Sequence, residues 1–79
     1  MKKIEFYRTY SYSDDKDQNL EIRDFETMEL AKENALSDDD NYFFTLDKIV
    51  MIFDGIIKTK VIPIGRIPCK KDLSEYKSK

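Results

Sequence analysis

The hydrophobic pattern is strongest between Tyr42 and Ile64, where two apolar runs flank the pair Asp54-Gly55. Both runs are rich in β-branched and aromatic residues, which favour strands. Asp and Gly both accept the positive φ angles of a two-residue type I′ turn. The pattern therefore predicts a long β-hairpin that turns at Asp54-Gly55, and the rest of the chain is arranged around it.

Polar and apolar residues also alternate near the amino terminus, over residues 3–12. This period of two predicts a strand. Four apolar or aromatic residues fall on one parity of that strand: Ile4, Phe6, Tyr10 and Tyr12. After a polar loop, residues 20–25 predict a second short strand that pairs with the first. The candidates for burial on this second strand are Leu20, Ile22 and Phe25.

The period changes to that of a helix over residues 28–36. Thr27 precedes this segment and is suited to cap the helix amino terminus. Met28, Ala31 and Ala35 share one stripe at helical spacing, and the two small alanines would allow the helix to lie close to a sheet. We therefore expect one helix at about 27–36, with its alanine stripe facing inward.

The predicted element order is β-(β)-α-β-β, which favours a small two-layer α+β domain with one helix packed on a mainly antiparallel sheet. A chain of 79 residues is the length of one domain. Gly65 and Pro68 interrupt the last apolar run. We therefore assign residues 1–67 to a single domain and residues 68–79 to a polar carboxyl-terminal tail.

A two-residue turn would place Met51 opposite Lys58 and Ile49 opposite Lys60. One face of the hairpin would then carry Val50, Ile52, Ile57, Thr59 and Val61, and the single helix would cover it. The other face has no helix left to cover it, and an exposed apolar patch with a charged rim is typical of an interaction surface. The candidate partner-binding residues on that face are Ile49, Met51, Phe53, Lys58 and Lys60. The alternative is that the chain covers this face itself.

The composition limits the chemistry. The chain has no histidine, which excludes histidine-based triads and zinc sites with histidine ligands, and its two glycines form no phosphate-binding loop. Cys69 is the single cysteine, so no internal disulfide can form, and we interpret it as an incidental thiol in a linker. No apolar run reaches the length of a membrane span. We expect a non-enzymatic protein without a metal or cofactor, soluble and cytoplasmic, that makes no membrane contact.

The formal net charge of −2 hides an asymmetry along the chain. Residues 13–40 contain eleven acidic and three basic residues, a net charge of −8, whereas residues 56–79 contain seven basic and two acidic residues, a net charge of +5. Such fields steer partners of opposite charge. The predicted acidic surface, which could imitate DNA phosphates or be ordinary solvated charge, comprises Asp14, Asp15, Asp17, Glu29, Glu33, Asp38, Asp39 and Asp40.

Residues 15–26 resemble an EF-hand calcium loop. The matching positions are Asp15, Asp17, Asn19, Ile22 and Glu26. The resemblance implies oxygen ligands at alternate positions around one Ca²⁺. It departs from the family at Leu20, which stands where the loop has its turn glycine, and no entering helix is predicted. A solvated acidic turn is the alternative interpretation.

Taken together, the sequence predicts a small protein-binding module with a protein partner. The chain has the general look of small phage or mobile-element proteins, which suggests an accessory factor or an inhibitor of a host or defence enzyme that handles nucleic acid. One alternative is a nucleic-acid-binding protein that uses the basic last third, although a pI of about 5.1 disfavours it. The other is an obligate homo-oligomer that buries the hairpin face or joins edge strands.

Overall fold

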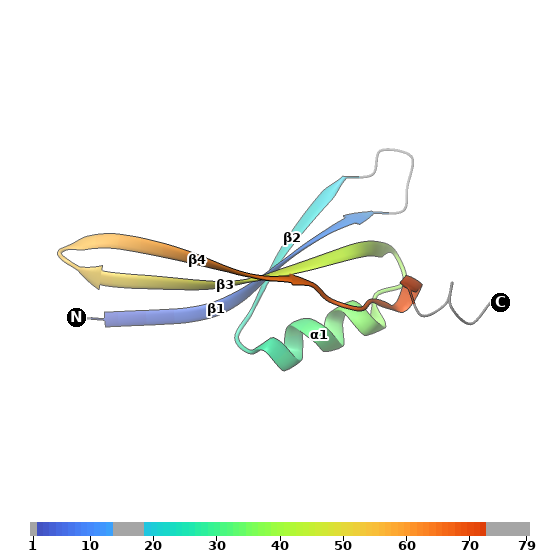
Figure 1. Ribbon diagram of the computed structural model, residues 1–79, viewed down its shortest axis with the longest axis horizontal. Helices are drawn as coiled ribbons and strands as arrows, with labels where there is room; N and C mark the ends of the chain where they lie inside the picture. Colours follow the sequence, from blue (N-terminus) through green and yellow to red (C-terminus); the bar gives the residue numbers. More distant parts are fainter. Residues whose placement is uncertain (1, 14–18, 73–79) are drawn as a thin grey trace.

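The computed structural model describes residues 2–13 and 19–72. It contains one four-stranded antiparallel sheet and one helix, which confirms the predicted α+β class. The elements are β1 (Lys2–Ser13), β2 (Leu20–Phe25), α1 (Met28–Ser37), β3 (Asn41–Asp54) and β4 (Ile56–Arg66). The strand order across the sheet is β2-β1-β3-β4, so that β2 and β4 form the two edges (Figure 1).

The two amino-terminal strands form the predicted hairpin, with Tyr10 opposite Ile22 and Tyr12 opposite Leu20. The predicted burial of Leu20 and Ile22 is wrong, since these side chains are 51% and 54% exposed. Phe25, at the other end of β2, is half-buried. The difference arises because successive strand residues point to opposite faces of a sheet, and only the face that carries Phe25 is covered by the helix.

Helix α1 begins and packs as its sequence predicts. The Thr27 hydroxyl oxygen accepts a hydrogen bond from the backbone N–H of Leu30 at 3.2 Å, which satisfies one of the free donors at the helix amino terminus. Ala31 and Ala35 are completely buried. Their small side chains allow the helix backbone to lie close to β1, β2 and β3.

The main core is a cluster between α1 and the sheet. Its buried members are Ala31, Ala35, Phe44, Leu46, Ile67 and Cys69, with Tyr7, Phe25 and Met28 packed against them. The chain after β4 therefore contributes to the core, and the backbone N–H of Ile67 donates to the carbonyl of Phe44 at 3.0 Å. The interpretation of Cys69 as a linker thiol is wrong, because Cys69 is 0% exposed. The packed domain extends past the predicted boundary at residue 67, whereas residues 73–79 lie outside the described chain.

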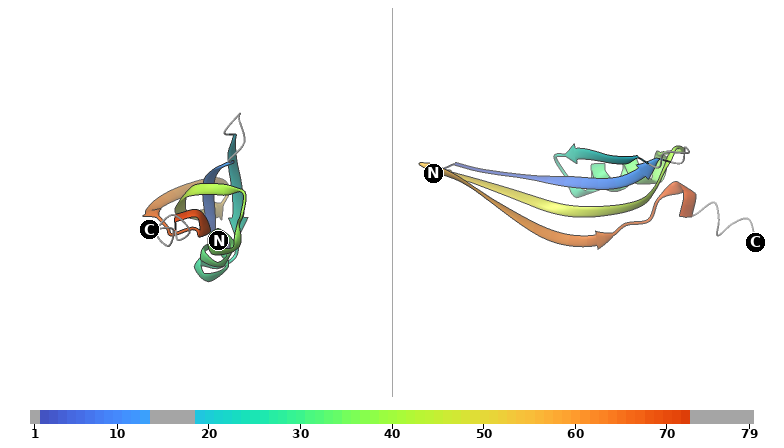
Figure 2. Two further views of the ribbon diagram at one scale, coloured as in Figure 1. Left: turned by 90° about the vertical axis from the view of Figure 1, so that its right-hand side faces the viewer. Right: turned by 90° about the horizontal axis from the view of Figure 1, so that it is seen from above.

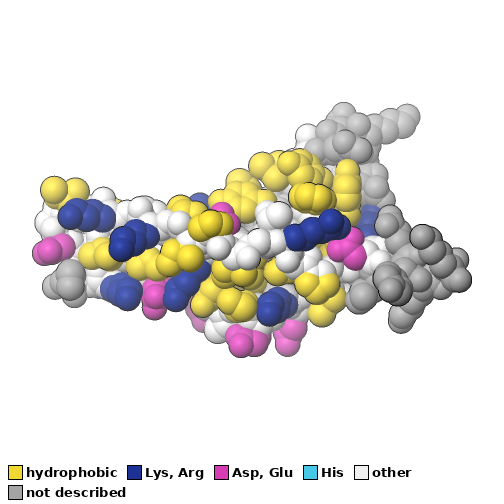
Figure 3. Space-filling model, in the orientation of Figure 1, with side chains coloured by type: hydrophobic (Ala, Val, Ile, Leu, Met, Phe, Trp, Pro, Cys, Tyr) yellow, Lys and Arg dark blue, Asp and Glu magenta, His cyan; other side chains and the backbone are white. Residues whose placement is uncertain are grey.

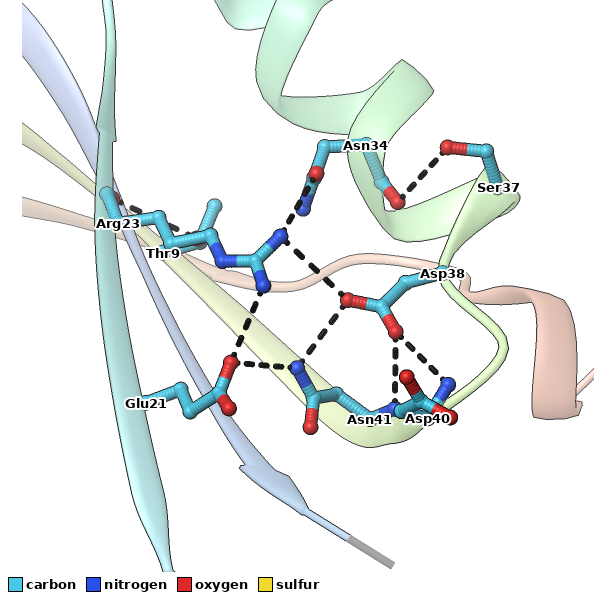
Figure 4. A network of polar contacts seen from close by, with 8 residues as sticks. All are labelled: Thr9, Glu21, Arg23, Asn34, Ser37, Asp38, Asp40 and Asn41. Carbon is cyan, nitrogen blue, oxygen red and sulfur yellow. Dashed lines mark hydrogen bonds and ion pairs between the residues drawn. The ribbon is translucent and has the colours of Figure 1, made fainter.

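A polar network fastens the carboxyl end of α1 to the sheet (Figure 4). The guanidinium of Arg23 on β2 donates to the side-chain oxygen of Asn34 at 3.1 Å and lies 3.6 Å from the carboxylate of Asp38. Asn41 donates to Glu21 at 2.7 Å and to Asp38 at 3.1 Å. The Asp38 side chain is only 8% exposed. Asp38 is thus a structural acceptor and does not belong to an exposed acidic surface, which corrects its predicted place.

The molecule is elongated, with extents of 53 × 26 × 16 Å. Helix α1 contacts β1, β2 and β3 at one end of the sheet, and β4 is not among the described strands that it contacts (Figures 1 and 2). The other end is a thin three-stranded extension, over which the described residues place no second layer. We call it the arm, and it comprises residues 2–6 of β1, 48–54 of β3 and 56–62 of β4.

The predicted hairpin register is wrong by one residue. Gly55 alone separates the paired residues Asp54 and Ile56, and its φ of 73° lies in the left-handed region that favours glycine. Lys58 lies opposite Ile52, and Lys60 lies opposite Val50. A shift of one residue moves every side chain of a strand to the other face. Lys58 and Lys60 therefore do not share a face with Ile49, Met51 and Phe53.

Truncating the core should unfold the domain far more readily than truncating the arm. Leu46→Ala should lower the free energy of unfolding by about 2–5 kcal/mol, because it leaves a cavity between α1 and the sheet. Ile56→Ala should change it by less than about 0.5 kcal/mol, because Ile56 is 70% exposed. Urea unfolding followed by circular dichroism measures both. Equal losses in the two variants would contradict this location of the core.

Candidate protein-binding surface

The face of the sheet away from α1 has no helix over it in the described part of the chain, and we call it the helix-free face. Strand alternation and the pairing register place the same kinds of residue on it from all four strands. Its apolar members are Ile4, Phe6, Tyr10, Tyr12, Leu20, Ile22, Tyr42, Ile49, Met51, Phe53, Ile57, Val61 and Pro63. Figure 3 shows the arm from a side on which basic side chains lie among hydrophobic ones.

Cross-strand rows organise the arm part of this face. Ile49 lies between Phe6 and Val61. Met51 lies between Ile4 and Thr59 in the next row toward the tip. Directly opposed side chains are close enough to pack on one another. The rows thus form a continuous apolar strip without a charged residue at these six positions.

The predicted patch residues differ in their exposure. Ile49 is only 2% exposed between its neighbours, so it supports the surface and presents little area to a partner. Met51 and Phe53 are half-buried. The sequence prediction missed the two most exposed residues on the arm part of the helix-free face: Ile57 is 61% exposed and Val61 is 54% exposed. Both residues belong to the apolar run that predicted β4, but the predicted two-residue turn assigned them to the face under the helix.

Lys58 and Lys60 form part of a basic strip on the opposite face of the arm. Lys48 and Lys3 lie on the same face, beside Glu5. The Lys48 ammonium is 3.1 Å from the Glu5 carboxylate, and the Lys3 ammonium is 3.9 Å from it. The arm therefore has one mostly apolar side and one side, called the basic side, on which these lysines lie among Ile52, Ile56 and Ile62.

Aromatic side chains gather at the end of the helix-free face away from the arm. The Tyr12 ring lies 6.3 Å from the Tyr42 ring and 6.4 Å from the Phe43 ring, measured between centroids. The Arg66 guanidinium lies 4.6 Å from the Phe43 ring centroid, within cation–π range. Phe43 has a φ of 58°, a strained conformation for a bulky residue, and the β1–β3 pairing is irregular there. Aromatic and arginine side chains are the residue types that most often dominate protein interfaces.

Arg8 and Arg66 on the helix-free face have carboxylate partners within the chain. Arg8 donates to both carboxylate oxygens of Asp24, at 2.7 and 3.2 Å, and this hydrogen bonding raises the pKa of Arg8. Arg66 donates to Asp72 at 2.9 Å. Paired charges of this kind are compatible with an apolar contact, because each guanidinium keeps an acceptor when water leaves.

Strand β4 is the long edge of the sheet. All eleven of its residues are exposed. Five of them are large and branched, with 41% to 70% exposure: Ile56, Ile57, Val61, Ile62 and Ile64. An edge strand presents unpaired backbone N–H and C=O groups along its outer side.

The predicted acidic features are only partly brought together. Glu29 and Glu33 are exposed on α1, and Asp39 forms an ion pair with Lys70. Asp14, Asp15 and Asp17 lie outside the described residues.

The calcium-loop alternative is wrong, because residues 20–25 form an extended strand. A strand of this length holds Glu26 about 20 Å from Asn19, too far for both to ligate one ion.

An open groove of about 440 Å³ lies where α1 begins beside the arm. Its lining residues are Glu5, Tyr7, Glu26, Thr27, Met28 and Glu29.

Within residues 2–13 and 19–72, no group of three or more acidic or cysteine side chains is placed to hold a metal ion. Among the described helical segments, none is long and apolar enough to cross a membrane.

The Glu5 ion pairs should make stability depend on pH at the acid end. The hydrogen bond from Lys48, with the charges of Lys3 and Lys48, lowers the pKa of Glu5 below its usual 4.5. A depressed carboxyl pKa stabilises the folded state above the ordinary value, and this contribution is lost as the pH falls through the folded pKa. Glu5→Gln should therefore flatten the acid limb of the stability curve. Identical acid limbs in urea titrations of the two proteins would contradict the assignment, and an NMR titration of Glu5 measures its pKa directly.

Burial of Cys69 predicts slow thiol chemistry. In the folded protein, a thiol-specific colorimetric reagent should react with Cys69 at least a hundredfold more slowly than in 8 M urea, because the sulfur is completely buried. The folded protein with Ser37→Cys, whose new thiol would lie at an exposed position, serves as the reactive control. Equal rates for Cys69 with and without urea would place it outside the core.

Comparison with known proteins gives no relative: no protein-family model, curated protein or solved structure matches the chain.

Proposed function

We propose that this protein is a non-enzymatic protein-binding module that engages its partner through the helix-free face. The observation that carries the proposal is that, within residues 2–13 and 19–72, no second layer covers one face of the four-stranded sheet. Large apolar side chains are exposed on that face at Ile57, Val61 and Ile22. Monomeric proteins rarely expose contiguous apolar patches larger than a few hundred Å² unless they serve an interaction.

The size of the face suits a protein partner. Strand β3 has fourteen residues, which span about 46 Å, and three strands are about 14 Å wide. The flat footprint is thus on the order of 600 Å² before the relief of the side chains is added. This approaches the ~800 Å² that each partner buries in a standard protein interface.

The distribution of residue types on the face also supports a protein partner. Aliphatic, methionine and phenylalanine side chains occupy the arm, and the Tyr12, Phe43 and Arg66 group occupies the opposite end. Interfaces combine an apolar centre with aromatic and arginine anchors in this way. Among the described strand residues of this face Lys2 is the only lysine, and Arg8 and Arg66 already have carboxylate partners, so the face offers little to a phosphate backbone.

Nucleic-acid binding is the second candidate, because the basic strip on the other side of the arm combines Lys3, Lys48, Lys58 and Lys60. Glu5 already forms ion pairs with Lys3 and Lys48, which reduces the charge available to phosphates. Binding of this kind would weaken steeply with salt. An apolar contact through the helix-free face would change little between 50 and 300 mM salt.

Finer roles rest on the sequence alone and stay predictions. An accessory or inhibitory role toward an enzyme that handles nucleic acid is suggested by the chain's general similarity to small phage proteins, and the acidic segment would steer the encounter. A single cysteine fits a cytoplasmic location.

Two isoleucines on opposite faces of β4 provide a matched test. Ile57→Asp puts a charge on the helix-free face and should reduce capture of a protein partner from a lysate of the source cells at least tenfold. Ile62→Asp puts the same charge on the basic side, opposite Lys48, and should leave capture within twofold. Quantitative pull-down with circular dichroism as a folding check measures both.

The reverse pattern, with partner capture lost only in Ile62→Asp, would assign binding to the basic side. Equal capture by wild type and folded Ile57→Asp would refute the role of the helix-free face.

A further inference from the structure

We infer that β4 pairs antiparallel with β4 of a second copy, centred on Val61, to give a continuous eight-stranded sheet. This goes beyond the proposed function, because it uses the edge of the sheet and leaves the helix-free face available. The partner it names is a second copy of this chain.

The first observation is the unequal protection of the two edges. The β2 edge has six residues and leads directly into α1. The β4 edge has eleven residues, all exposed, and is the outermost strand in the sheet order. A long edge rich in exposed β-branched residues is a template for pairing with another strand.

The second observation is that this edge is selective. Lys58 and Lys60 project from one side of β4, and Pro63 removes one backbone donor. Like charges directly opposite one another destabilise a strand pair. An added strand must therefore place uncharged or acidic residues opposite both lysines.

The β4 sequence meets this condition in one register. Centring on Val61 pairs the seven residues 58–64, up to the irregularity in β4, and it places Lys60 opposite Ile62 and Lys58 opposite Ile64 of the second copy. Centring on residue 60 opposes the two copies of Lys60, and centring on residue 59 opposes Lys58 to Lys60. Centring on residue 62 pairs only five residues, 60–64, before the irregularity. Among registers that pair at least seven residues on the regular side of the irregularity, only the one centred on Val61 opposes no like charges.

The third observation is the charge distribution along the molecule. The arm carries five lysines and two acidic residues, a net charge of +3. The remaining described residues, 7–13, 19–47 and 63–72, carry six basic and ten acidic residues, a net charge of −4. Because β4 runs from the tip of the arm toward the body, antiparallel pairing sets each positive arm beside the negative body of the other copy.

The symmetry of the pairing decides what happens to the faces. Antiparallel pairing about Val61 has its two-fold axis perpendicular to the sheet, so that both helix-free faces lie on the same side. The dimer would then present one platform, about twice as wide as that of a single copy. Loss of the dimer and loss of partner binding are therefore separable results.

Substitutions at Ile64 test the register by charge. Ile64 is 41% exposed and lies at the irregularity in the β3–β4 ladder, opposite no residue of β3. Ile64→Lys sets a lysine opposite Lys58 of the second copy twice, and Ile64→Glu sets a glutamate there twice. The dimer dissociation constant should be roughly tenfold higher for Ile64→Lys than for Ile64→Glu. Adding Lys58→Glu to Ile64→Lys should lower the dimer dissociation constant again, because each new lysine then lies opposite a glutamate.

Light scattering after size exclusion, over a range of protein concentrations, should give twice the chain mass of 9.4 kDa for the wild type. A wild type that stays at the monomer mass up to about 200 μM would overturn the inference. A dimer whose dissociation constant is the same in Ile64→Lys and Ile64→Glu would overturn the proposed pairing.

Cysteine cross-linking tests the centre of the pairing. Val61 lies on the axis, so Val61→Cys would set two thiols on directly opposed residues, whose Cα atoms lie about 4.5–5.5 Å apart, within disulfide range. Ile22→Cys is the matched control, because Ile22 has the same 54% exposure on the helix-free face but lies on the other edge. Under mild oxidation Val61→Cys should form at least tenfold more covalent dimer. Equal cross-linking of the two variants would contradict the β4 pairing.

The two proposals fail in different ways. If Ile64→Lys becomes monomeric and still captures the protein partner, the dimer inference stands and the face works in a single copy. If Ile57→Asp loses the partner and remains dimeric, the face and the edge are separate sites.

Discussion

The structure depends on one mismatch of length: a helix of ten residues covers a sheet whose longest strand has fourteen. At about 1.5 Å per residue the helix spans about 15 Å, whereas β3 spans about 46 Å. The helix therefore covers one end of one face, where Ala31 and Ala35 allow close approach to Phe44 and Leu46. Beyond that end the described residues form sheet without a second layer. The exposed arm, the helix-free face and the long β4 edge all follow from this limit.

Local patterns in the sequence predict most of the fold, because those patterns act over a few residues. The four strands, the helix and its Thr27 cap were all found where alternation and capping chemistry indicated. The hairpin register was predicted incorrectly, because it depends on whether one or two residues form the turn at Gly55. Both choices use the same Asp-Gly pair. The burial of Cys69 was also missed, because it results from the chain folding back over the core after β4. No local period reports such a contact.

The candidate site was predicted to the extent that it lies within one strand. Met51 and Phe53 share a face with Ile49 whatever strand lies beside them, and the structure keeps all three on the helix-free face. Lys58 and Lys60 were assigned across the turn, so the error of one residue moved both to the other side. The correction replaces two lysines with Ile57 and Val61 and makes the face more apolar than the sequence suggested. It also removes the lysines from the rim that the sequence had placed around the apolar patch.

The corrected register changes the meaning of the lysines as well. On the helix-free face they would have bordered an apolar patch and reduced its affinity for an apolar partner. On the opposite face they keep one side of a thin, exposed sheet charged, which opposes stacking of the arm through both faces at once. Their position in β4 also restricts which strands can pair with that edge, because a neighbour must avoid like charge at two alternate positions. The same pair of residues thus limits unspecific association while leaving one face and one pairing register open.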